Sequence, residues 1–140
     1  MKVTVVYWSG TGNTKKMAEL IQSGANEAGA EAILKEVNSA SPSDLENCDV
    51  MALGCPSMGA EVLEEYEFEP FVAAIEDRVK GKKLALFGSY GWGDGEWMRD
   101  WDRRMLAAGA DLITESLIVN EFPSGNDAEQ CVAFGKAIAG

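Results

Sequence analysis

The stretch Ser9-Gly-Thr-Gly-Asn-Thr14 has the composition of a loop that binds a phosphate group. Gly10 and Gly12 let the backbone turn tightly and come close to a ligand. The other four positions carry hydroxyl or amide groups: Ser9, Thr11, Asn13 and Thr14. A helical pattern follows at once, and the free N–H groups and positive dipole end of a helix N-terminus favour an anion. The residues therefore predict a phosphate site that needs no Arg or Lys.

Two better-known phosphate loops do not fit this stretch. A Walker loop requires Gly-Lys-Ser/Thr after a four-residue gap, and a dinucleotide fingerprint requires a third Gly where this chain has Lys15. Nucleoside triphosphates and dinucleotides are therefore poor candidates. A polar turn without a ligand is the alternative, and the number of donors argues against it.

The elements that must position this loop alternate between buried strands and amphipathic helices. Apolar runs predict strands at 3–8, 32–37, 50–54, 84–88 and 112–119, the last interrupted or extended near Glu115. Helical patterns lie at 14–28, 68–79, 97–105 and from about 127, where Asp127 and Gln130 resemble a capping box. Strands this apolar need cover on both faces, which predicts an α/β fold with a parallel sheet between helix layers. The 140 residues suit one domain, spanning 1–140.

Ligands of such sheets lie beyond the carboxyl ends of the strands, where two further loops carry chemistry. The loop Cys55–Leu63 contains a thioether at Met58, a flexible Gly59 and a carboxylate at Glu61. The loop Ser89–Gly95 presents Tyr90 and Trp92 between glycines, away from any periodic face. Such aromatics are poor core residues and good walls for a flat ring.

Composition excludes several classes of function. The chain has no His, which rules out a Ser-His-Asp triad and a His-ligated metal, and its three Cys lack CxxC spacing, so no metal site is predicted. A net charge of -11 disfavours nucleic acid and anionic membranes and favours a partner with a basic face. No long apolar segment or leader is evident, so we expect a cytoplasmic protein.

At this point the sequence resembles the flavodoxins, and most closely their short-chain clostridial type. The resemblance covers nearly the whole chain and rests on three motifs in the family's order: VVYWSGTGNT, LGCPSMGAEVLEE and LFGSYGWGDGEWMRDW. It implies a doubly wound, five-stranded parallel sheet with helices on both faces. Flavodoxins are themselves the standing example of the strand order 2-1-3-4-5 with FMN at the switch between strands one and three.

The resemblance also implies a role for each loop in binding FMN. Ser9 to Thr14 would hold the phosphate, Trp92 and Met58 would lie against the two faces of the flavin, and Ser89 would lie near the ribityl or phosphate end. Glu61 would accept from flavin N3–H, and the peptide at Gly59 would turn its carbonyl toward protonated N5. The implied FMN-binding residues are Ser9, Gly10, Thr11, Gly12, Asn13, Thr14, Ser57, Met58, Gly59, Ala60, Glu61, Ser89, Tyr90, Gly91 and Trp92.

Two positions depart from the pattern of some relatives. Pro56 stands where some have a second phosphate-binding Ser, and Pro has no N–H or hydroxyl to give, so Ser57 or a water would substitute. Ala60 is a position that varies in the family, and it bears on the stability of the semiquinone.

The implied function is that of a low-potential, one-electron carrier rather than an enzyme, which cycles FMN between semiquinone and hydroquinone. Its partners would be redox proteins with basic docking faces, such as a ferredoxin/flavodoxin reductase or ferredoxin-dependent enzymes, and the carrier itself would be a monomer. Five acidic residues near the flavin edge would guide docking or merely solvate the start of a helix: Glu61, Glu64, Glu65, Glu67 and Glu69.

Three other functions fit less well. An FMN-dependent quinone or nitro reductase on the same fold is the main alternative, although this chain is short for one. A signalling receiver domain needs acidic residues just after strand one, where this chain reads Tyr7-Trp8-Ser9-Gly10. A structural module without a ligand is disfavoured by a Trp in a glycine loop.

Overall fold

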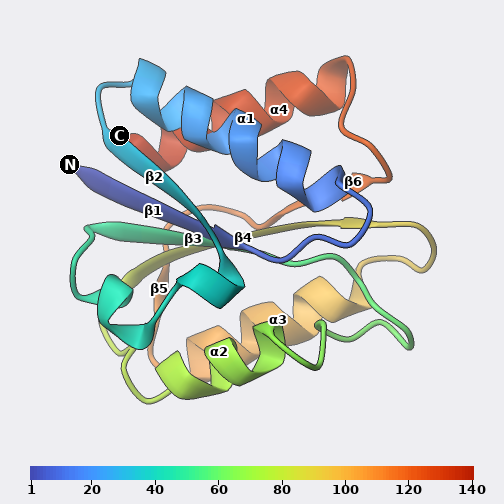
Figure 1. Cartoon of the computed structure of the whole chain (residues 1–140), viewed down its shortest axis with the longest axis horizontal. Helices are drawn as coiled ribbons and strands as arrows, with labels where there is room; N and C mark the ends of the chain where they lie inside the picture. Colours follow the sequence, from blue (N-terminus) through green and yellow to red (C-terminus); the bar gives the residue numbers. More distant parts are fainter.

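The computed structural model of the chain describes residues 1–140 and contains one parallel sheet between two pairs of helices (Figure 1). The strands are β1 (Lys2–Tyr7), β2 (Glu31–Glu36), β3 (Val50–Gly54), β4 (Lys83–Tyr90), β5 (Asp111–Leu112) and β6 (Leu117–Asn120). The helices are α1 (Asn13–Glu27), α2 (Phe68–Ile75), α3 (Glu96–Ala107) and α4 (Asn126–Ala139), with short 3-10 turns η1 (Val37–Ser39) and η2 (Pro42–Leu45). Every pairing between named strands is parallel, in the order β2-β1-β3-β4-β5. The predicted fold class and strand order are confirmed.

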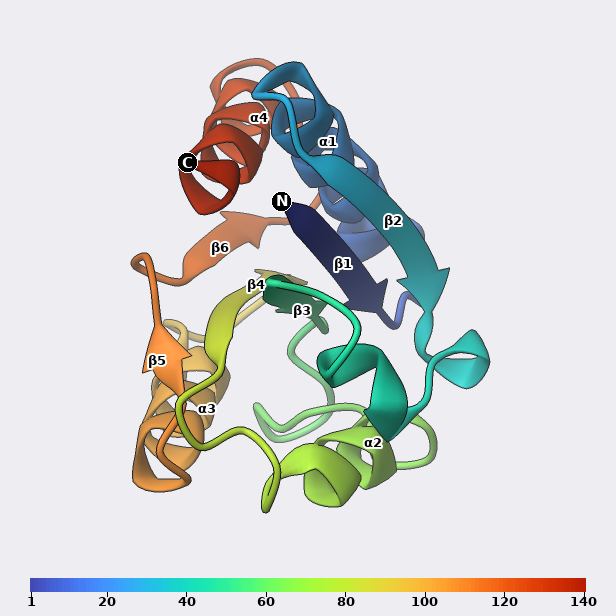
Figure 2. The same ribbon diagram turned by 90° about the vertical axis from the view of Figure 1, so that its left-hand side faces the viewer.

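The helices cover both faces of the sheet. Figure 2 shows α1 and α4 over one face and α2 and α3 over the other. The two apolar cores under these pairs contain 19 and 16 buried residues, so neither face is left open. All five residues of β3 are buried, as the central strand of a doubly covered sheet requires.

The fifth strand is broken into two segments that both pair with β4. β5 pairs with Lys83 and Leu84, and β6 pairs with residues 87–90, while the chain between them leaves the sheet. The predicted interruption near Glu115 is confirmed. Because β6 supplies a partner, β4 continues through Ser89 and Tyr90, which the sequence had suggested to lie in a loop.

Two predicted element ends are wrong. The capping box at Asp127 and Gln130 does not form, because α4 begins after Gly125 with no side-chain cap. The helix predicted over 68–79 ends at Ile75. Val79 lies in the turn after the helix, and its side chain is still buried in the core. None of the helices combines the length and apolar composition that a membrane span requires.

Helices α1 and α4 pack with their backbones close together. A Cβ atom built on Gly135 of α4 would lie 2.1 Å from the carbonyl oxygen of Ile21. One built on Gly24 of α1 would lie 2.0 Å from the carbonyl oxygen of Val132. The absence of a side chain at both positions sets the separation of the two helices.

Candidate functional site

One cavity of about 480 Å³ lies at the carboxyl ends of β1, β3 and β4. This volume is in the range of cofactor pockets. Its lining joins the three loops that sequence analysis singled out, together with the chain after β6. The lining residues are Trp8, Gly10, Thr11, Asn13, Pro56, Ser57, Met58, Ser89, Tyr90, Gly91, Glu121 and Phe122.

Eight predicted site residues line this cavity, and the others lie around it. The eight are Gly10, Thr11, Asn13, Ser57, Met58, Ser89, Tyr90 and Gly91. Seven do not line it: Ser9, Gly12, Thr14, Gly59, Ala60, Glu61 and Trp92. The predicted site is thus one contiguous region, of which about half forms the wall.

The side of the cavity next to α1 is built by a loop that closes on itself. Gly12 has φ +97° and stands before α1, so only a residue without Cβ takes this conformation easily. The Ser9 hydroxyl accepts a hydrogen bond from Gly12 N at 3.1 Å. Thr11 and Asn13 line the cavity at the start of α1, where a helix has free backbone N–H groups that favour an anion.

Thr14 and Ser89 connect this loop to β4. Both side chains are buried, and their hydroxyl groups share a hydrogen bond of 2.7 Å. The contact joins residues 75 positions apart in the sequence. It fixes the start of α1 against the strand that carries the aromatic loop.

The loop after β3 is a tight hairpin with a free tip. Met58 N donates to Val62 O at 2.8 Å, and Val62 N donates to Met58 O at 2.9 Å. Between these two residues, Gly59 and Glu61 both have positive φ, of 48° and 56°. No atom lies within 4 Å of a Cβ built on Gly59, so the peptide at the tip has open space around it.

Glu61 connects the hairpin tip to the aromatic loop. Its Oε1 accepts from the N–H of Glu96 at 3.2 Å, at the N-terminus of α3, where the helix dipole favours a carboxylate. A Cβ on Gly93 would lie 2.5 Å from the Glu61 carboxyl carbon, so a glycine at 93 is needed for this approach.

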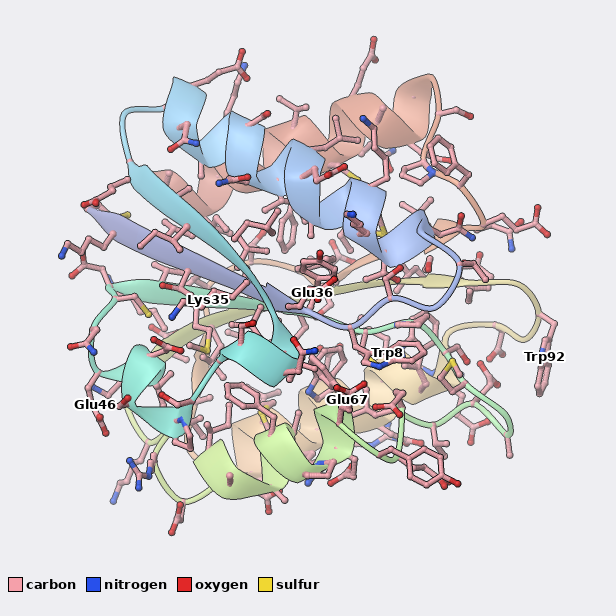
Figure 3. The ribbon with its side chains drawn as sticks, viewed as in Figure 1. Trp8, Lys35, Glu36, Glu46, Glu67 and Trp92 are labelled. Carbon is pink, nitrogen blue, oxygen red and sulfur yellow. The ribbon has the colours of Figure 1, made fainter.

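Trp92 projects from the β4–α3 loop at the edge of the molecule (Figure 3). Its side chain is 63% exposed, the second-highest fraction among the large apolar residues after Tyr66 at 87%. An aromatic side chain this exposed, in a loop next to the cavity, is available to contact a ligand.

Four lining residues were absent from the predicted set. Trp8 was assigned to the first strand, and Pro56 was noted only as a departure from relatives. Glu121 and Phe122 follow the last strand, and Glu121 has φ 61°, which is uncommon for a residue other than glycine. The rule that ligands lie beyond the carboxyl ends of parallel strands, applied to the fifth strand as well, identifies this pair.

Cys55 begins the hairpin loop but is not available as a nucleophile. Its side chain is fully buried, and burial raises the pKa of the thiol far above its usual range. Its Sγ accepts a hydrogen bond from Glu64 N at 3.4 Å. The residue is therefore structural.

The chemistry of the lining suits a phosphorylated compound with a flat ring. The lining combines hydroxyl, amide and backbone donors with Met58 and three aromatic rings, and Glu121 is its single charged residue. A doubly wound sheet with a neutral phosphate loop at its switch point defines a mononucleotide-binding α/β protein.

Comparisons with known proteins give the family. The model of the family described as Flavodoxin matches residues 5–135. A flavodoxin of Clostridium beijerinckii is 53% identical over 136 residues, which cover 96% of this chain and 97% of that protein. A flavodoxin of Megasphaera elsdenii is 45% identical over 137 residues, with 98% of each chain covered. The solution structure of the two-electron reduced Megasphaera elsdenii flavodoxin superposes with a TM-score of 0.89 at 44% identity, over 98% of each chain.

The chain therefore belongs to the flavodoxin family. Its cofactor is FMN, and it is an electron-transfer protein rather than an enzyme.

Proposed function

We propose that this protein is a low-potential one-electron carrier that cycles FMN between semiquinone and hydroquinone. The observation that carries the proposal is the tip of the hairpin loop. Gly59 has positive φ and free space around it, while the Met58–Val62 pairing holds the base of the loop. A peptide there can turn over and direct its carbonyl at a protonated ring nitrogen without disturbing the sheet.

In this proposal the three loops divide the cofactor between them. Gly10 to Thr14, with Ser9 closing the loop, bind the phosphate through neutral donors, and Ser57 supplies the hydroxyl that Pro56 cannot. Met58 and Trp92 lie against the two faces of the ring. Glu61 Oε1 is engaged by Glu96 N–H, which leaves Oε2 to accept from N3–H.

The surroundings of the ring make an added negative charge costly. Bound FMN supplies one-electron redox chemistry, and the protein sets its potential through charge and burial. The chain carries 23 acidic and 12 basic residues, and no basic side chain lines the cavity. Surroundings of low polarity and negative charge disfavour the anionic reduced flavin, which lowers the potential of the semiquinone/hydroquinone couple.

We further propose that an acidic rim beside the ring guides docking on redox partners with basic faces, with the carrier acting as a single-domain monomer in the cytoplasm. The acidic rim consists of the half-buried Glu61 and the exposed Glu65 and Glu67. Glu64 does not belong to it, because its side chain is buried, and Glu69 is neutralised by a bidentate pair with Arg104 at 2.7 Å. From the sequence, both were candidates either for docking or for solvating the start of a helix.

The redox proposal is tested by reduction of the protein loaded with FMN. We expect one FMN per chain and a blue neutral radical on partial photoreduction, measured by visible absorption. Gly59→Val is expected to lower the radical fraction several-fold, because a β-branched residue resists positive φ. Gly29→Val, the same change at a positive-φ glycine with open space just beyond the end of α1, is the matched control. Direct passage of the unaltered protein to the two-electron form would refute the carrier and favour the reductase alternative.

Salt dependence tests the acidic rim. Electron transfer to a basic redox protein should slow at least about tenfold as ionic strength rises from about 0.01 to 0.5 M, because screening removes the steering charge. Stopped-flow absorbance gives the rate. Glu65→Gln should flatten the profile, whereas Glu27→Gln, at the far end of α1, should not. A profile without slope in the unaltered protein means that these acids only solvate the surface.

A further inference from the structure

Glu64 is a carboxylate that the fold buries beside the FMN site. Its side chain is 5% exposed, although nothing in the sequence distinguishes it from its acidic neighbours. The two carboxylate oxygens accept three backbone hydrogen bonds, from Tyr66 N at 2.9 Å and from Glu67 N and Phe68 N at 2.8 Å each. These bonds fix the turn that leads into α2.

The turn held by Glu64 reaches the phosphate loop through Glu67 and Trp8. Glu67 Oε1 accepts from Trp8 Nε1 at 3.2 Å, and Figure 3 shows the two side chains side by side below the end of β1. The Trp8 ring lies against the phosphate loop, since a Cβ on Gly10 would be 3.0 Å from it. The position of Glu67 therefore sets the position of one wall of the cavity.

Glu64 also contacts the hairpin loop, through Cys55. Glu64 N donates to Cys55 Sγ at 3.4 Å, which joins the two ends of the segment that contains Met58 and Gly59. Inside this closure lies the Met58–Val62 pairing. The backbone N–H of Glu64 therefore closes the base of the hairpin loop.

We propose that Glu64 is a positioning residue for FMN: its buried carboxylate holds the turn that places Glu67 against Trp8 and the phosphate loop, and its backbone N–H closes the hairpin loop at Cys55. The inference rests on the proposed placement of FMN in the cavity. It assigns Glu64 no contact with the cofactor. Glu64 acts only through Glu67, Trp8 and Cys55.

The ionised carboxylate is what this position needs. Burial opposes ionisation, but the three backbone N–H groups outweigh it, and the pKa of Glu64 is lowered. A glutamine would keep one acceptor oxygen and turn an NH₂ group toward a backbone N–H that needs an acceptor. Substitution by Gln therefore disrupts the turn with almost no change in volume.

The test is Glu64→Gln, followed first without flavin. The ¹H–¹⁵N resonance of the Trp8 indole, assigned by its loss in Trp8→Phe, is expected to shift or broaden, although Glu64 does not touch Trp8. FMN affinity, from quenching of flavin fluorescence, should fall at least about tenfold, and riboflavin affinity by a smaller factor of about three. Asp77→Asn makes the same chemical change at an exposed position beyond the other end of α2, and should alter neither resonance nor affinity.

Two further variants separate the inference from loss of folding. Glu67→Ala removes only the path to Trp8 and should weaken FMN more than riboflavin, whereas Cys55→Ala removes only the path to the hairpin and should weaken both equally. Folded Glu64→Gln protein with an unshifted Trp8 resonance and unchanged affinities would overturn the proposal. If Glu64→Gln does not fold, unchanged affinities in both other variants overturn it. Failure of the unaltered protein to bind FMN contradicts the function itself, which is a separate result.

Discussion

Replacement of Trp92 by alanine is expected to weaken FMN and riboflavin by the same factor, on the order of 10- to 100-fold. The reason is that the substitution removes an aromatic face on which the ring stacks. In comparable contacts, replacing the aromatic side chain by alanine costs about 1–3 kcal/mol of binding free energy. Because the side chain is 63% exposed without ligand, the free energy of unfolding of the apoprotein should stay within about 0.5 kcal/mol. Fluorescence titration and urea denaturation measure the two quantities.

Two substitutions control for this effect. Trp92→Phe keeps a ring and should recover most of the affinity for both ligands. Tyr66→Ala removes the most exposed aromatic side chain, which lies outside the three loops proposed to bind FMN, and should leave affinity unchanged. A loss confined to FMN in Trp92→Ala would move Trp92 from the ring to the phosphate end and contradict the proposed placement.

Gly135→Ala is expected to destabilise the protein by about 3 kcal/mol. The added methyl group would lie 2.1 Å from Ile21 O and 2.9 Å from Ala25 N, and both are backbone atoms that cannot rotate away. The helices must separate, and this cost exceeds the gain of about 1 kcal/mol that alanine brings to a helix interior. The midpoint of urea unfolding, with an unchanged slope, reports the change.

Gly24→Ala offers a second measurement of the same contact. It meets the carbonyl of Val132 at 2.0 Å, and the double variant should cost less than the sum of the two, because one separation of the helices relieves both clashes. Ser23→Ala, exposed on the same helix, should stay within about 0.5 kcal/mol. A stabilised Gly135→Ala protein would show that the two helices are free to move apart.

These glycines illustrate what the sequence could not reveal about the fold. Alternating apolar runs and helical patterns were enough to predict the parallel sheet, because they report which face of each element is buried. A glycine inside a helical pattern reads only as a local weakness. Its purpose at Gly24 and Gly135 is visible only when two segments more than 100 residues apart meet.

The site shows a similar division. Glycines and hydroxyl residues between 9 and 14 predict a phosphate loop from the sequence alone, because that chemistry is local. Glu64 was placed among surface acids, since carboxylates are rarely buried and three backbone partners cannot be read from sequence. Phe122 was missed for a different reason: the rule for the carboxyl ends of parallel strands had not been extended to the fifth strand.

The buried sulfur of Cys55 has a consequence for the chemical durability of the carrier. Thiolates, not thiols, attack electrophiles and are oxidised, and burial raises the pKa of all three cysteines, for Cys131 to about 12. At neutral pH these cysteines are therefore thiols, and the thiolate that adduct formation and oxidation to sulfenic acid require is scarce. A sulfur atom in the core at the start of the hairpin loop is in this way chemically inert packing.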